Sequence, residues 1–242
     1  MYNLLISAGT MVAAFLLLKF ATPLSWWLSL VIALLLFMGV FYLISRMVMK
    51  KVMAIMETAT KDLQAQRIEK GIRELQSALP YGKWQVYVTG QVNAQIGMVY
   101  YMKRDFAAAF PYLEKTFFKN WVAMGMLAVS YMKRSKKDKM KETFDKAVQG
   151  SPKEALLWNL YAYCLGEINE PGRAKEILEK GLKKVPGDEK TQQNLELLRE
   201  GKKMKMKGFG EMWLQFHLES IGTIQKQQMA AMGGMKRRIV RR

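Results

Sequence analysis

Two long uncharged stretches open the chain and restrict its fold more than any other feature. The first runs from Asn3 to Leu18 and the second from Leu24 to Ser45, and Lys19 is the one charged side chain before Arg46. As a helix, the second stretch spans roughly 33 Å at about 1.5 Å per residue, enough for a bilayer core of about 30 Å. The sequence therefore predicts two transmembrane helices.

The segment between the two stretches indicates a tight hairpin. Pro23 interrupts the helix, and Trp26 and Trp27 suit the lipid–water boundary. Three basic residues directly follow the second stretch: Arg46, Lys50 and Lys51. The positive-inside rule then places both termini in the cytoplasm, and we expect a protein with two membrane helices, in a prokaryotic inner membrane.

Two alternatives to this anchor remain. The first stretch could be a cleaved signal peptide, but it has no basic region before it and no convincing cleavage site. Both stretches could instead be buried helices of a soluble protein, which two adjacent uncharged runs of this length disfavour.

A second kind of pattern follows the anchor. Between Arg46 and Leu79 apolar residues recur at three- and four-residue spacings, as in an amphipathic helix, and Pro80 and Gly82 end the pattern. We expect a connector helix within residues 47–82 that packs on the next part of the chain. A dimerising coiled coil is the alternative, but the spacing is too irregular for it.

An internal repeat with a period of 34 residues occupies the middle of the chain. One copy contains large and small residues in a fixed order: Trp158, Tyr161, Ala162, Leu165, Ala174, Leu178, Gly181 and Pro186. The preceding copy matches it with Met124, Leu127, Ala128, Tyr131, Met140, Phe144, Ala147 and Pro152. An earlier copy, shorter by three residues, supplies Ile96, Gly97, Tyr100, Ala109 and Leu113.

This order of residues resembles the tetratricopeptide repeat (TPR) over about residues 90–188, although Gly90 and Trp121 depart from it. The resemblance implies pairs of antiparallel helices that bury their apolar faces only by stacking. Small residues, here Gly97, Ala128 and Ala162, would let the two helices of a pair approach closely. Aromatic residues would fill the space between pairs, and a polar helix with Leu195, Leu197 and Leu198 inward would cap the stack.

The predicted fold is thus all-α, with a transmembrane helical hairpin followed by a TPR-like α-solenoid. The expected domains are the hairpin at 1–46, the connector helix at 47–82, the repeats with their cap at 83–207, and an amphipathic helix with a basic tail at 208–242. The repeats themselves fall at about 90–120, 121–154 and 155–188.

The resemblance also implies a groove lined by the first helix of each pair. Some TPR domains clamp a peptide carboxylate there with basic residues, but the matching positions hold no Lys or Arg, so we expect no such clamp. The predicted partner-binding residues are Gln91, Met98, Val122, Met126, Val129, Asn159 and Tyr163. An apolar, methionine-rich groove of this kind suits an amphipathic helix or a hydrophobic segment of a protein partner.

The chain itself has a candidate occupant of this groove. Aromatic and apolar residues recur at helical spacing after Gly208: Phe209, Trp213, Phe216, Ile221 and Ile224. We expect a helix within residues 211–232 that either folds back into the groove or lies on the bilayer surface, and we favour the fold-back.

The net charge of +18 points to an anionic neighbour. Basic runs lie at 133–141, 202–207 and 236–242. The residues predicted to contact an anionic surface are Lys133, Arg134, Lys136, Lys137, Lys139, Arg237 and Arg238. Membrane head groups are the expected anion. Nucleic acid would rest on charge alone, because no nucleic-acid-binding motif is present.

No motif for catalysis, metal or cofactor binding is present, and we expect neither enzymatic activity nor a small-molecule substrate. His217 is the single histidine and Cys164 the single cysteine, and no phosphate-binding glycine loop occurs. The expected function is a membrane-anchored scaffold or assembly subunit that binds a segment of a protein partner at the cytoplasmic face. The alternative is an accessory protein that binds anionic lipid or nucleic acid through its basic clusters.

Overall fold

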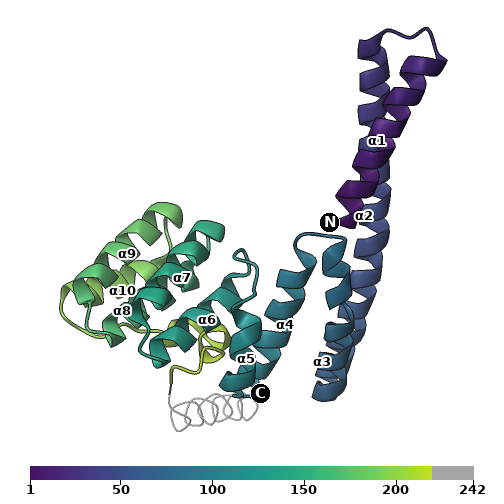
Figure 1. Cartoon of the computed structure of the whole chain (residues 1–242). Coiled ribbons are helices and arrows are strands. Elements are labelled where there is room, and N and C mark those ends of the chain that lie inside the picture. The colour runs from purple at the N-terminus through teal and green to yellow at the C-terminus, as the bar shows by residue number, and fades with distance from the viewer. Residues whose placement is uncertain (220–242) are drawn as a thin grey trace, which may run out of the picture. The chain divides into compact units, whose positions relative to one another are not determined.

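The computed structural model describes residues 1–219. All regular elements in this range are helices (Figure 1), so the prediction of an all-α fold is confirmed. Contacts divide the chain into two compact units, Met1–Phe117 and a second unit that begins at Phe118. The predicted residues Ile221, Ile224, Arg237 and Arg238, with the rest of the basic tail, lie outside the described residues.

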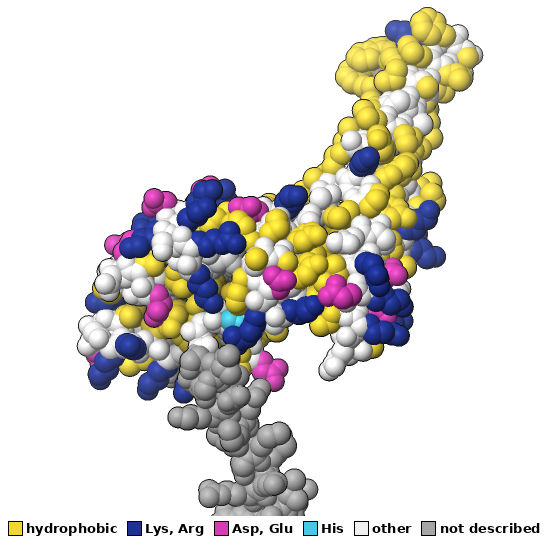
Figure 2. All heavy atoms as spheres, turned by 60° about the horizontal axis from the view of Figure 1, so that its bottom comes forward, with side chains coloured by type: hydrophobic (Ala, Val, Ile, Leu, Met, Phe, Trp, Pro, Cys, Tyr) yellow, Lys and Arg dark blue, Asp and Glu magenta, His cyan; other side chains and the backbone are white. Residues whose placement is uncertain are grey.

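Two long apolar helices, α1 (Tyr2–Ala21) and α2 (Trp26–Gln64), begin the first unit and pack on each other. Both are long and apolar enough to cross a membrane. Figure 2 shows an almost continuous hydrophobic surface over this hairpin. The two helices meet at small side chains that are fully buried, Ser7, Ser29 and Ala33. Small residues at such a contact let the two backbones approach closely.

Side-chain contacts hold the start of α1 against α2 and against the residues just before α4. The Asn3 side-chain amide donates hydrogen bonds to Ser45 Oγ at 2.6 Å and to Gln85 Oε1 at 3.3 Å. The ring of Tyr2 packs edge-on against Trp84, with 5.5 Å between centroids. The N-terminus therefore lies beside the end of the uncharged part of α2.

The predicted single connector helix within residues 47–82 is wrong, because the chain reverses direction inside it. α2 continues beyond the uncharged stretch to Gln64, α3 (Ile68–Ser77) folds back along it, and a 3-10 helix, η1, follows at Leu79–Lys83. Folding back lets the apolar stripe bury itself within the same chain. Its core residues include Val48, Val52, Ala59, Ile72, Leu75, Val92 and Ile96.

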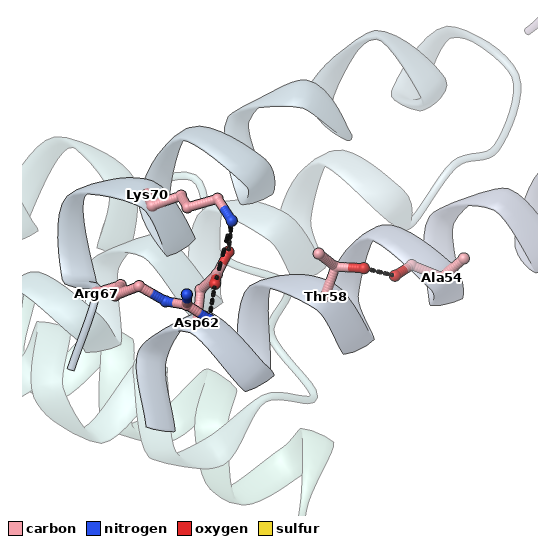
Figure 3. A network of polar contacts seen from close by, with 5 residues as sticks. All are labelled: Ala54, Thr58, Asp62, Arg67 and Lys70. Carbon is pink, nitrogen blue, oxygen red and sulfur yellow. Dashed lines mark hydrogen bonds and ion pairs between the residues drawn. The ribbon is translucent and has the colours of Figure 1, made fainter. Parts of the chain in front are cut away.

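A charged cluster fixes the turn between α2 and α3 (Figure 3). The Asp62 side chain is 3 % exposed and pairs with Arg67 at 2.8 Å and Lys70 at 3.3 Å. Gln66 adopts φ = 59° in the turn. A non-glycine residue seldom adopts this left-handed conformation. Because Gln66 occupies the position, neither Gly nor Pro marks the break in the sequence.

The first unit ends with the pair α4 (Val88–Met102) and α5 (Phe106–Leu113). The close approach predicted at Gly97 is confirmed, because a Cβ atom there would lie 2.8 Å from the Leu113 side chain. Asp105 caps α5 by accepting a hydrogen bond from the Ala108 N–H at 3.0 Å.

The second unit contains sequentially paired helices. In chain order they are α6 (Trp121–Lys133), α7 (Lys137–Gly150), α8 (Ala155–Glu167), α9 (Pro171–Lys184) and α10 (Glu189–Arg199). Aromatic packing between neighbours follows the prediction: Phe144 of α7 stacks on Tyr161 of α8 at 4.7 Å. On α10, Leu195 is buried, while Leu197 and Leu198 are half-buried.

One turn geometry recurs after five helices in the two units. A residue with positive φ follows each helix, and the next N–H bonds back to the carbonyl five residues earlier, as in a Schellman motif. The positive-φ residues are Gln66, Arg104, Ser135, Asn169 and Gly201. The corresponding bonds join Arg67 to Asp62, Asp105 to Tyr100, Lys136 to Tyr131, Glu170 to Leu165 and Lys202 to Leu197. The turn therefore marks four helix pairs and the end of α10.

After α10 the chain continues through a 3-10 helix, η2 (Lys207–Phe209), and one helical turn, α11 (Glu211–Leu214). The longer helix predicted to begin at residue 211 thus ends early within the described residues. His217 has φ = 51°, which is incompatible with a continuing helix.

Candidate partner-binding surface

The end of the described chain packs on α6 and α8, which are the first helices of the two helix pairs in the second unit. We call residues 209–219 the docking segment. Its Trp213 and Phe216 are 1 % and 0 % exposed. Trp213 packs edge-on against Tyr163 of α8, and the ring of Phe216 lies 6.5 Å from that of Trp121 of α6. The fold-back that the sequence favoured is therefore confirmed for these residues.

A glycine makes room for this contact. A Cβ atom at Gly125 of α6 would lie 2.9 Å from Leu160 Cδ2 and 2.9 Å from Phe216 Cε1, closer than real Cβ contacts. The docking segment is also held at its end, where Lys133 Nζ donates a hydrogen bond to the His217 carbonyl at 3.1 Å. Shape and polar contacts thus both fit the docking segment to α6 and α8.

A buried polar network holds the preceding residues, 201–208, which we call the strap. Asn159 of α8 donates to Thr191 Oγ1 at 2.7 Å and accepts from Asn194 at 2.9 Å. Asn194 in turn accepts a hydrogen bond from the backbone N–H of Lys205 at 2.7 Å. Met206 is 3 % exposed, and its sulfur lies 3.8 Å from the Asn194 side-chain nitrogen. Because buried polar groups are costly when unpaired, this network fixes the path of the strap.

The predicted partner-binding residues differ in their accessibility. In the second unit Met126, Val129 and Asn159 are buried, while Val122 and Tyr163 are half-buried. Those in the first unit lie on α4, where Gln91 is exposed and Met98 half-buried. Partner binding at these positions stays a prediction, but Met126, Val129 and Asn159 offer no open surface in this structure.

The predicted anionic-contact residues of the second unit lie at and after the end of α6. Lys136, Lys137 and Lys139 are exposed, and Lys139 Nζ lies 5.7 Å from the centre of the Tyr131 ring. Figure 2 shows Lys and Arg side chains spread over much of this unit, with acidic side chains among them. The charge alone therefore does not single out one contact surface.

A cavity of about 970 Å³ lies between the strap and α8, α9 and α10. Six lysines line it: Lys175, Lys190, Lys202, Lys203, Lys205 and Lys207. The sequence singled out the run at 202–207 but gave no sign that Lys175 and Lys190 would join it. That juxtaposition depends on the path of the strap.

Two titratable groups of α8 near this surface, Cys164 and Tyr163, have raised pKa values. Burial raises the pKa of the Cys164 thiol strongly, and Cys164 is fully buried on α8. Burial, with a further contribution from the charge of Glu167, raises the pKa of Tyr163 to about 12. Within residues 1–219 no group of acidic, His and Cys side chains could hold a metal ion. Burial and the raised pKa of Cys164 both disfavour a reactive thiolate there.

No protein-family model matches the chain, and no curated protein matches it. What the surface does must be argued from its own geometry.

Proposed function

We propose that this protein is a membrane-anchored scaffold or assembly subunit. In this proposal α1 and the first part of α2 span the membrane, and a TPR-like stack of helix pairs holds a segment of a protein partner at the cytoplasmic face.

The anchor is supported by the surface and the contacts of α1 and α2. The hairpin carries few buried residues, so its apolar surface needs a non-aqueous environment. Arg46, Lys50 and Lys51 begin the polar part of α2, which suits a cytoplasmic boundary. The contacts of Tyr2 and Asn3 with Trp84 and Gln85 favour an N-terminus on that same side.

The TPR-like nature of the stack is supported by the recurring turn. The turns at Ser135 and Asn169 are separated by the period of 34 residues that the sequence pattern has. A close helix contact at a glycine also supports the TPR-like stack, because a Cβ atom at Gly181 of α9 would lie 2.8 Å from Trp158 of α8. The turn after α2 extends the same geometry to a pair that the sequence did not indicate.

The burial of Trp213 and Phe216 on α6 and α8 is the observation that carries the binding proposal. It means that this surface accepts a short segment with two aromatic residues three positions apart. A partner segment of similar pattern would fit the same surface, in competition with the docking segment. Large aromatic anchors in well-packed pockets commonly dominate such binding.

Co-purification of partners with the full chain tests this function. The tagged protein is extracted from its native membrane in mild detergent, and co-purifying proteins are quantified for three variants. Replacing both aromatics (Trp213→Ala with Phe216→Ala) should increase recovery of a specific protein, because the competitor is removed. Met212→Ala, in the same turn but 46 % exposed, should not.

Addition of Tyr163→Ser to the double variant should then abolish the increase, because the partner loses its aromatic contact. The function is contradicted if no protein shows a recovery that depends on both Tyr163 and the docking segment.

A further inference from the structure

The cavity beneath the strap carries unbalanced positive charge. Among its six lysines Lys202 pairs with Glu200 at 2.7 Å, and Lys190 Nζ lies 5.1 Å from the centre of the Phe209 ring. The other four form no ion pair with any residue in the range 1–219: Lys175, Lys203, Lys205 and Lys207. Glu167 and Glu219 are the acidic lining residues. Lysines around one cavity create a positive potential that favours an anion.

The same cavity has an apolar part. Tyr163, Leu198, Met206 and Trp213 line it together with the lysines. Sites for small ligands have volumes of about 300–1,000 Å³, and this cavity, at about 970 Å³, suits one small molecule better than a polymer. A ligand that satisfies both parts must combine an anionic group with an apolar body.

Contacts within the chain hold the strap, which forms one wall of the cavity, in a fixed position. Asn194 binds the backbone of Lys205, and Met206 is buried beside it, so the strap is anchored in the middle of its basic run. Lysines on a fixed backbone lose less conformational freedom when they bind a ligand than lysines on a free tail do.

We propose that this cavity binds a single anionic phospholipid, with the phosphate ester among the lysines and the apolar part against Trp213 and Tyr163. The chemistry that is recognised is a phosphate ester joined to a hydrocarbon group. This site shares Tyr163 and Trp213 with the partner-binding surface, but its lysines on the strap, α9 and α10 lie outside that surface. The apolar N-terminal hairpin favours a lipid as the source of this chemistry.

Protection of the strap from trypsin tests the proposal with the full chain in a neutral detergent. The probe is dihexanoyl phosphatidylglycerol, and the two comparison ligands are dihexanoyl phosphatidylcholine and inorganic phosphate. Cleavage within 202–207 should slow saturably with the phosphatidylglycerol, by about ten-fold at a concentration near ten times Kd, because the bound state must open before cleavage. Cleavage at the exposed Lys153 serves as the internal reference and should not change.

Two charge-matched variants separate the cavity from general electrostatics. Replacing three cavity lysines with glutamine (Lys175→Gln, Lys190→Gln and Lys205→Gln) should abolish the protection. Replacing three lysines near the α6–α7 turn (Lys136→Gln, Lys137→Gln and Lys139→Gln) should preserve it, again with cleavage at Lys153 as the reference.

Four results would overturn the proposal: no protection of the wild-type strap, equal protection by phosphatidylcholine, equal protection by inorganic phosphate, or equal loss in the two triple variants. Protection by an acidic peptide but not by phosphatidylglycerol would also overturn it, and would assign the cavity to a protein ligand. None of these results bears on the recovery of a partner protein, so failure here is distinct from failure of the proposed function.

Discussion

The indole of Trp213 packs edge-on against the phenol ring of Tyr163, with 4.9 Å between their centroids and 74° between their planes. Tyr163 is one of the residues at which a partner was predicted to bind. The aromatic surface that a partner would meet is therefore already in contact with the chain's own docking segment. Binding of a partner at Tyr163 requires this contact to open.

Removal of the indole should release the docking segment. A Trp→Ala change in a packed site costs about 3–5 kcal/mol. Because the docking segment follows α10 and lies outside the helix pairs, we expect Trp213→Ala to act mainly by local opening. Tryptic cleavage within the strap should become many times faster, while the helices of the second unit persist by circular dichroism.

Met212→Ala is the matched control for this prediction, because Met212 is exposed in the same helical turn. Its cleavage rate should equal that of the wild type. Equal rates for Trp213→Ala and the wild type would mean that the contact does not hold the segment.

Gly125 and Gly166 provide a second pair of matched substitutions. Alanine is preferred over glycine inside a helix by about 1 kcal/mol. At Gly166 of α8 an added Cβ meets nothing within 4 Å, so Gly166→Ala should stabilise the second unit. At Gly125 it would meet Leu160 and Phe216 at 2.9 Å, and overpacking of this kind costs about 1–3 kcal/mol.

Gly125→Ala should therefore lower the thermal unfolding midpoint of the second unit and Gly166→Ala should raise it. A rise for both variants would show that Phe216 does not lie against α6. Differential scanning calorimetry of the full chain in detergent measures the two midpoints.

Some of the fold could be predicted because it depends on local composition. Helices α1 and α2 follow from uncharged stretches long enough to cross a bilayer, and Gly97 lies where its pattern requires a close helix contact. The break after Gln64 could not be predicted, since Gln66 adopts a conformation that favours glycine. Its energy is offset by the burial of apolar residues on α2 and α3, which is a tertiary effect.

The candidate site was predicted in part for the same reason. Trp213 and Phe216 are spaced as one face of a helix, which indicated a buried role. Asn159 was interpreted as a partner-facing residue, whereas its amide in fact binds Thr191 and Asn194. The lysine-lined cavity depends on Lys205 meeting Asn194, a contact between parts of the chain that no sequence pattern connects.

The single cysteine offers a direct probe of the second unit. Cys164 is fully buried and burial raises the pKa of its thiol, so both access and thiolate content are low in the folded state. Labelling with a maleimide at neutral pH should be orders of magnitude slower than in denaturant, where it should go to completion. Rapid labelling of the native protein would contradict the packing of α8.

Alkaline pH should weaken the second unit. Burial raises the pKa of Tyr163 to about 12, above the value of about 10 expected in the unfolded chain. Since the folded pKa is the higher one, the stability due to the neutral phenol is complete below about pH 10 and is lost as the pH rises through about 12. The rate of Cys164 labelling, measured on folded protein at increasing pH, follows this loss of stability. Tyr163→Phe should reduce the loss. An equal loss in both proteins would remove Tyr163 as its source.

Protease accessibility in sealed membrane vesicles tests the central claim most directly. With trypsin added to right-side-out vesicles, we predict that the strap stays uncut, because everything after Arg46 is enclosed. With trypsin added to inverted vesicles, the strap should be cut while the fragment containing α1 and α2 remains in the membrane. Cleavage of the strap in right-side-out vesicles, or loss of the whole chain into the supernatant of either preparation, would contradict a membrane anchor with a cytoplasmic stack of helix pairs.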